Sequence, residues 1–219
     1  MQGTDLRDKR RGGYESERPE VQALVPSDAR RILDIGCSAG GLGAALKRRP
    51  GVEVVGIELD EGYAGDARAV LDRVIQGDVQ QVLADPPDLG TFDVAIAADV
   101  LEHLTDPWTA LQRAVELLRP GGTAIVSLPN VQYLAVFWTL ARRGRWPRDP
   151  AGLFDATHLR WFTVRDARDL LEQAGLEVVR EEPRYWVYGW KLRLFRALAR
   201  TPLRPFMAGQ FVLVGRKPA

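Results

Sequence analysis

The segment from Ile32 to Gly43, ILDIGCSAGGLG, constrains the fold more than any other, because a short apolar run passes directly into a glycine-rich turn. With Asp34, Gly36 and Gly40, it is typical of a strand-to-helix turn that holds a nucleotide-type cofactor. The same letters also match G-x-S-x-G, the nucleophile elbow of a hydrolase, with Ser38 as the nucleophile. The segment alone leaves both interpretations open.

Short apolar runs alternate with helical patterns along the chain. We expect strands at residues 31–35, 52–58, 74–75, 92–97 and 123–128, two more at LEVV and FVLVG, and helices at 42–49, 61–71, 107–118 and 163–174. This alternation predicts an open, mostly parallel α/β sheet with helices on both faces. Ligands bind such sheets beyond the carboxyl ends of the strands, where the glycine turn lies.

Composition narrows the classes of protein. A chain of 219 residues with 46% hydrophobic residues predicts a single domain. Lysine and arginine number 30 against 29 acids, so no overall charge attracts nucleic acid. The single cysteine, Cys37, predicts no disulfide framework, no metal site and a reducing, cytoplasmic setting. Residues 1–20 are polar and predict a mobile arm, not a secretory signal.

Acidic residues follow the next two strands. Glu58 ends the second strand, 18 residues after Gly40, where a carboxylate can accept hydrogen bonds from both hydroxyls of a ribose. Asp78 follows the third strand and could accept from an adenine amine, with the Val79 amide serving a ring nitrogen. A Gly-Asp turn without any ligand is the simpler interpretation of Asp78.

Taken together, the motifs LDIGCSAG, GIELD, GDV, FDVAIAADVLEHL, LRPGG and SLPN resemble those of class I S-adenosylmethionine-dependent methyltransferases. Residues 14–175 look like the small-molecule branch, which includes ubiquinone-type O-methyltransferases, methionine-biosynthesis-like proteins and glycan-pathway methyltransferases. The resemblance implies a Rossmann-like, doubly wound sheet of seven strands whose last strand is antiparallel, with a small lid. It also implies S-adenosyl-L-methionine as the cofactor.

The resemblance assigns the cofactor-binding residues by position. It implies that Asp34, Gly36, Cys37 and Gly40 face the methionine part, Glu58 and Leu59 the ribose, Asp78 and Val79 the adenine, and Ala98 the sulfonium. Ser38 stands where the family often has glycine.

The other two classes of enzyme fit less well. A hydrolase of this type needs an acid and then a histidine after the nucleophile, and an elbow so near the N-terminus leaves little room for preceding strands. A dehydrogenase would suit Glu58, but LRPGG and the antiparallel ending do not favour it.

The only two histidines are candidates for a general base. Transfer of a methyl group to an alcohol requires alignment of the reactants and removal of a proton, which imidazole can accept near neutral pH. His103 lies in DVLEHL after the fourth strand, and His158 lies in FDATHLRWFT. A hydrogen-bonding histidine with a structural role is the alternative for each.

Two aromatic and basic segments, 133–162 and 185–207, are predicted to form the lid. The first supplies Phe137, Trp138, Trp146, Phe154, Trp161 and Phe162 and four arginines, Arg142, Arg143, Arg145 and Arg148. The second contains a basic amphipathic helix, which permits a peripheral membrane contact, although its short length favours a lid helix packed on the sheet.

These features predict a methyltransferase for a small hydroxylated acceptor, such as a sugar, a glycan precursor or a metabolite that bears phosphate or lipid. The glycan-type acceptor rests on the family resemblance and on the arginine-rich lid. A cofactor-binding partner that regulates another enzyme without turnover is the alternative. The oligomeric state is not predicted.

Overall fold

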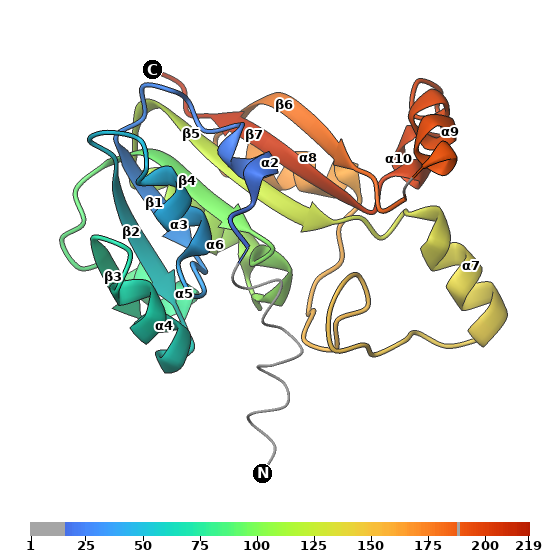
Figure 1. The fold of residues 1–219 in the computed structure, drawn as a ribbon, viewed down its shortest axis with the longest axis horizontal. Helices are drawn as coiled ribbons and strands as arrows, with labels where there is room; N and C mark the ends of the chain where they lie inside the picture. The colour runs from blue at the N-terminus through green and yellow to red at the C-terminus, as the bar shows by residue number, and fades with distance from the viewer. Residues whose placement is uncertain (1–15, 188) are drawn as a thin grey trace, which may run out of the picture.

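The computed structural model describes residues 16–187 and 189–219, through which a seven-stranded sheet runs (Figure 1). The strands are β1 (Arg31–Ile35), β2 (Glu53–Glu58), β3 (Arg73–Gln76), β4 (Phe92–Ala98), β5 (Leu118–Pro129), β6 (Glu177–Arg184) and β7 (Gln210–Arg216). Their order is β3-β2-β1-β4-β5-β7-β6. Only β7 pairs antiparallel, with β5 and β6, so the predicted sheet is confirmed.

Helices cover both faces of the sheet. They are α2 (Pro19–Gln22), α3 (Gly41–Leu46), α4 (Glu61–Arg68), α5 (Val79–Ala84), η1 (Leu101–His103, a 3₁₀ turn), α6 (Pro107–Glu116), α7 (Leu134–Arg143), α8 (Val164–Gln173), α9 (Trp190–Leu198) and α10 (Arg204–Met207). One core packs apolar residues of α5, α6 and α8 against the sheet, and the other packs residues of α2, α3 and α4. The doubly wound arrangement is therefore confirmed.

Several boundaries differ from the predicted ones. β5 begins at Leu118, before the Arg-Pro-Gly-Gly turn, because Phe92 already pairs with Leu118 before the register shifts. The first helix ends at Leu46, three residues before the predicted end. The helix predicted at 163–174 is present as α8, and Thr163 and Asp166 cap its start by accepting from each other's backbone amides.

The predicted arm at residues 1–20 is wrong for its last part. Residues 1–15 lie outside the described residues, but residues 16–20 pack against the body of the protein. Arg18 precedes α2 and pairs with Asp99 at the end of β4, with 2.8 Å between Nη1 and Oδ2. This partly buried ion pair holds residues 16–20 against the body of the protein, so sequence polarity alone was a poor guide to the mobility of the segment.

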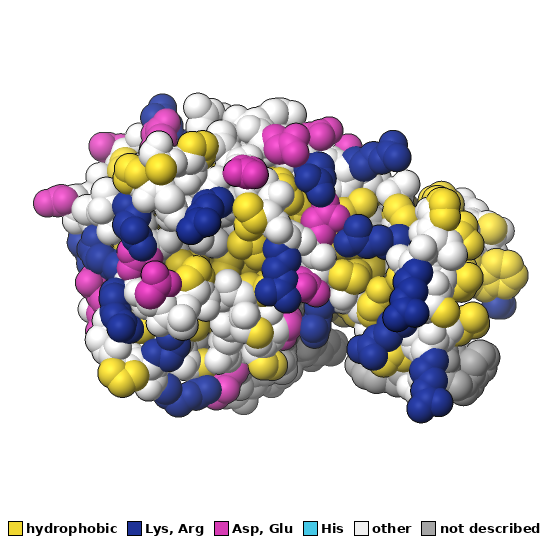
Figure 2. Space-filling model, turned by 90° about the horizontal axis from the view of Figure 1, so that it is seen from above, with side chains coloured by type: hydrophobic (Ala, Val, Ile, Leu, Met, Phe, Trp, Pro, Cys, Tyr) yellow, Lys and Arg dark blue, Asp and Glu magenta, His cyan; other side chains and the backbone are white. Residues whose placement is uncertain are grey.

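The two lid segments lie beyond the end of β5 and the start of β7, and they contact each other (Figure 1). Tyr133, Val136 and Leu153 form a small core, against which Phe195 of α9 packs. Apolar and basic side chains intermingle on this lobe (Figure 2), where Trp138 has 64% of its surface exposed. In the described part of the chain, no helix is both long and apolar enough to cross a membrane.

A substitution at Gly56 in β2 tests how tightly this strand packs against the glycine-rich turn that follows β1. A Cβ atom there would lie 2.5 Å from the Cys37 sulfur and 2.9 Å from a Leu71 methyl group, so Gly56→Ala is expected to destabilise the fold by about 1–3 kcal/mol. Gly65→Ala is the control, because nothing lies within 4 Å of that position in α4 and alanine favours a helix. Urea unfolding of both variants measures the difference. Equal midpoints for Gly56→Ala and the wild type would contradict the packing.

Candidate functional site

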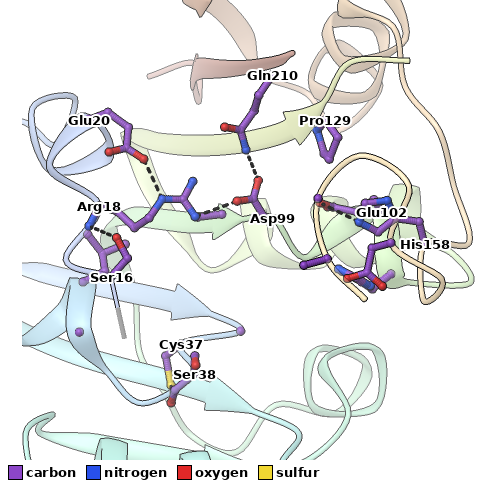
Figure 3. A pocket seen from close by; sticks show the side chains of 18 of the residues that line it. Ser16, Arg18, Glu20, Cys37, Ser38, Asp99, Glu102, Pro129, His158 and Gln210 are labelled. Carbon is purple, nitrogen blue, oxygen red and sulfur yellow. Dashed lines mark hydrogen bonds and ion pairs between the residues drawn. The ribbon is translucent and has the colours of Figure 1, made fainter. Parts of the chain in front are cut away.

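A cavity of about 740 Å³ opens at the carboxyl ends of β1 and β4 (Figure 3). Its walls come from segments far apart in the sequence, including Arg18 before α2, Ser38 in the first turn, Asp99 after β4, His158 in the lid and Gln210 in β7. The topology of a parallel sheet brings these segments together, since the ends of its central strands meet at one edge.

Glycine is required in the first turn. Gly36 has φ +69°, and a Cβ atom there would lie 2.4 Å from a methyl group of Val100. Gly40 has φ +83° and precedes α3. The turn is tied to the next strand, because the amides of Gly36 and Cys37 both donate to the carbonyl oxygen of Ile57.

Backbone strain gathers at the cavity. Among the described residues, the non-glycine residues with positive φ are Arg18, Ser38 and Asp99, with φ of 49°, 49° and 60°. All three line the cavity. Such conformations cost of order 1–3 kcal/mol each and cluster at functional sites, so this grouping supports a functional assignment of the cavity.

The sequence-predicted cofactor residues divide into two groups. Asp34, Gly36, Cys37, Ser38 and Ala98 line the cavity, whereas Gly40, Glu58, Leu59, Asp78 and Val79 do not. Glu58 nonetheless shapes the cavity, because its carboxylate accepts from the amides of Ser38 and Asp60, both at 2.8 Å. Asp78 caps α5 through Oδ1, which accepts from the Gln80 and Gln81 amides, and its contact with an adenine stays a prediction.

Asp34 is a predicted cofactor residue with a strongly shifted pKa. Its side chain is buried, with 3% exposed, and its Oδ2 atom has no hydrogen-bond partner among the described residues. Burial raises the pKa of Asp34 to about 7, and the nearby Glu58 carboxylate adds to the effect while Arg18 opposes it. Asp34 lines the cavity, and a buried carboxylate oxygen without a partner suits a cationic ligand group.

Three further residues that line the cavity, Arg18, Asp99 and Gln210, were not predicted from the sequence. Arg18 lies between Glu20 and Asp99, at 2.7 Å and 2.8 Å, and is the guanidinium that lines the cavity. Asp99 also accepts from Ser127 and Gln210. The position of Asp99 directly after a strand was a usable signal, but nothing local marks Arg18, which reaches the cavity only through the tertiary fold.

Both candidate bases lie in the cavity. The rings of His103 and His158 meet edge to face, with 4.7 Å between centroids. One nitrogen or oxygen atom from each of Glu102, His103 and His158 lies within 4.8 Å of the others. Burial lowers the pKa of His158, and the neighbouring His103 adds to this effect. Two imidazoles beside an open cavity can accept a proton from a bound hydroxyl group.

The hydrolase interpretation fails on geometry. Ser38 Oγ is buried and has no hydrogen-bond partner among the described residues, whereas a serine nucleophile requires a base within hydrogen-bond reach. The small side chain of Ser38 therefore takes the place of a glycine in the turn.

The lid contributes differently from what the sequence predicted. None of the six aromatic residues predicted for the first segment, nor its four arginines, lines the cavity. Trp186 does, packed edge to face on Tyr133 at 6.0 Å and directly over Gly209. Periodicity cannot tell which aromatic side chains of a lid turn inward, because this depends on how the two segments pack.

Comparisons with known proteins agree with this geometry. Residues 8–181 match a family model described as a methyltransferase domain. The chain is 36% identical over 155 residues to a ubiquinone biosynthesis O-methyltransferase from Ruegeria pomeroyi, an alignment that covers 68% of the chain and 60% of the relative. The chain thus spans less than two thirds of that relative.

Solved structures share the fold at low sequence identity. A SAM-dependent methyltransferase from Archaeoglobus fulgidus superposes with a TM-score of 0.71 at 18% identity, covering 99% of this chain and 100% of that one. The magnesium protoporphyrin IX methyltransferase from Synechocystis, solved with bound SAH, gives 0.63 at 18% identity, covering 95% and 84%.

Proposed function

Because the chain belongs to the S-adenosylmethionine-dependent methyltransferases, we propose that it transfers the methyl group of this cofactor to a hydroxyl oxygen of a small acceptor. The observation that carries the proposal is the cavity at the strand ends, whose lining includes Asp34, with a buried and unpartnered carboxylate oxygen, and two histidines. Asp34 suits the amino-acid part of the cofactor, and the histidines suit removal of a proton.

The residues present fit the cofactor. The orphaned Asp34 oxygen would take its ammonium group, and Arg18 would take its carboxylate. Glu58 would accept from the ribose hydroxyls, Asp78 and Val79 would face the adenine, and Ala98 would lie near the sulfonium. When bound, the cofactor supplies an already activated methyl group, so the chain needs only to orient the acceptor, exclude water and accept its proton.

The acceptor is proposed to carry its hydroxyl group on an aromatic ring. Trp186 gives the cavity an aromatic wall, and a phenol with a pKa of about 10 loses its proton to imidazole more readily than an aliphatic alcohol. The relative from Ruegeria pomeroyi is named as an O-methyltransferase of ubiquinone biosynthesis, which supports an oxygen acceptor. The glycan-type acceptor lacks such support, since the lid arginines lie outside the cavity lining.

A labelled-methyl transfer assay tests this function. The purified protein and labelled S-adenosylmethionine are incubated with catechol, with 3,4-dihydroxybenzoate, with simple sugars and with fractionated cell extract, followed by mass spectrometry of the labelled products. Methylated phenols are the expected result, and methylated sugars would contradict the acceptor class. Cofactor binding without any labelled product would instead favour the regulatory partner. The peripheral membrane contact of the lid stays a prediction.

Binding of S-adenosylhomocysteine is expected to depend on pH through Asp34. The ammonium group of the ligand favours the ionised form of the Asp34 carboxyl group. Below pH 7 this carboxyl group is mostly protonated in the free protein, so binding must release its proton. The affinity should therefore rise roughly tenfold as the pH increases from 6 to 7.5. Isothermal titration at both values measures this.

Two variants make the pH result specific. Asp34→Asn should bind more weakly and lose the pH dependence, whereas the exposed Asp66→Asn in α4 should behave as the wild type. A wild-type affinity that stays constant over this range would contradict the ammonium-binding role of Asp34.

A further inference from the structure

Glu102 is a buried acid to which the proposed function assigns no role. Only 1% of its surface is exposed, and neither carboxylate oxygen has a hydrogen-bond partner among the described residues. It nevertheless lines the cavity, in the η1 turn directly after β4. Leaving a buried carboxyl group unpaired costs stability, so a buried and unpartnered group of this kind calls for an explanation.

The lid is bound to Glu102 through its backbone. The carbonyl oxygen of Glu102 accepts from the amides of Leu159 and Arg160, at 2.8 Å and 3.0 Å. These bonds hold His158 beside the Glu102 side chain (Figure 3), with 4.0 Å between His158 Nε2 and Glu102 Oε1. This distance is about 1 Å longer than a hydrogen bond, a gap that a small side-chain rotation closes.

The partner of the other ring nitrogen fixes the tautomer of His158. Its Nδ1 lies 3.3 Å from the carbonyl oxygen of Leu153, and a carbonyl only accepts hydrogen bonds. The hydrogen of a neutral His158 is therefore on Nδ1, and Nε2 is an acceptor. A protonated Glu102 supplies the donor that Nε2 requires.

The surroundings of Glu102 favour its protonated form. Burial raises the pKa of Glu102 well above its usual value, the carboxylates of Asp99 and Asp155 raise it further, and Arg18 opposes them. For His158, burial and His103 lower the pKa, while Asp155 and Asp99 act in the opposite direction. Both shifts thus favour the neutral form, of the carboxyl group for Glu102 and of the imidazole for His158.

We propose that Glu102 is a positioning residue whose protonated carboxyl group donates a hydrogen bond to Nε2 of His158, which leaves His103 as the general base. The assignment of the base rests on the proposed function. His103 Nδ1 lies 3.3 Å from the Thr157 carbonyl oxygen and 3.1 Å from the Thr157 hydroxyl oxygen, so the hydrogen of neutral His103 is on Nδ1 and Nε2 is its basic nitrogen. The acceptor O–H bond breaks as its proton forms a bond to this Nε2, and the oxygen takes the methyl group as the bond from methyl to sulfur breaks.

Nuclear magnetic resonance of the ¹⁵N-histidine-labelled protein tests the pair without cofactor or acceptor. The chain has two histidines, so two imidazole spin systems are expected, and His158→Asn assigns them. In the wild type, we expect neutral His158 to carry its proton on Nδ1 and to titrate below the usual pKa of a histidine. A neutral His158 protonated on Nε2 would overturn the proposal, and this readout needs no variant at Glu102.

Glu102→Gln then distinguishes a protonated from an ionised carboxyl group. Replacing a neutral acid by a neutral amide should leave the titration midpoint of His158 within about 0.3 pH units, whereas loss of a carboxylate should lower it by about one unit or more. A fall of that size would overturn the proposal. The exposed Glu177→Gln is the matched control.

Mg²⁺ provides the remaining test. Its addition at millimolar concentration should leave both imidazole spectra unchanged. Saturable shifts of the Nε2 resonances would overturn the proposal and make the cluster a cation site. Because these measurements require no turnover, a failed pairing leaves the methyl-transfer proposal standing, and an inactive protein leaves the spectroscopic result standing.

Discussion

His103→Asn is expected to slow methyl transfer by about a hundredfold to ten-thousandfold, the usual contribution of a general base. The ring lies in the cavity, edge to face with His158, and asparagine keeps a polar side chain of similar reach while losing the basic nitrogen. Single-turnover rates with the acceptor that the labelled-methyl assay identifies provide the measurement. The affinity for S-adenosylhomocysteine should stay close to that of the wild type.

The companion variant separates the two histidines. His158→Asn should slow transfer by only about tenfold, because it disturbs the position of His103 and removes no base. When the rate of methyl transfer is measured against pH, its fall at low pH should have the same midpoint as the titration of His103 followed by nuclear magnetic resonance. A larger loss for His158→Asn than for His103→Asn would assign the base to His158 and contradict the division of roles.

Glu58→Ala is expected to weaken binding of S-adenosylhomocysteine by at least about a hundredfold. A carboxylate has about four lone-pair sites. Two of them serve the Ser38 and Asp60 amides, so the other two remain for the ribose hydroxyls. Each hydrogen bond to a charged group contributes about 1.5–3 kcal/mol, and alanine removes those to the ribose while it also releases the turn at Ser38.

Isothermal titration with S-adenosylhomocysteine measures this loss, and thermal unfolding of the free variant shows whether the fold survives. Glu61→Ala is the control, because Glu61 is an exposed acid three residues further along, at the start of α4, and lines no part of the cavity. Retention of wild-type affinity by a folded Glu58→Ala protein would remove Glu58 from the cofactor site.

The sequence predicted most of the sheet because its signals are local. Apolar runs such as Phe92–Ala98 are buried on both faces, and Gly36 is required by a positive φ and by the close approach of Val100. The acidic residues at the strand ends could also be predicted to lie near the site, since the carboxyl ends of parallel strands meet at one edge of the sheet. Contacts between residues far apart in the sequence have no such local signal, so the ion pair of Arg18 with Asp99 and the place of Trp186 in the cavity lining were not predicted.

The sequence by itself thus determined a doubly wound sheet, a glycine turn at its edge and a family of cofactor-dependent enzymes. Only the tertiary structure decided which side chains in and around that turn are buried and which of them have hydrogen-bond partners. Ser38 is no nucleophile because no base reaches it, and Glu102 becomes notable because the lid buries it beside His158. Fold patterns arise from neighbours in sequence, whereas protonation depends on burial and on charges that only folding brings together.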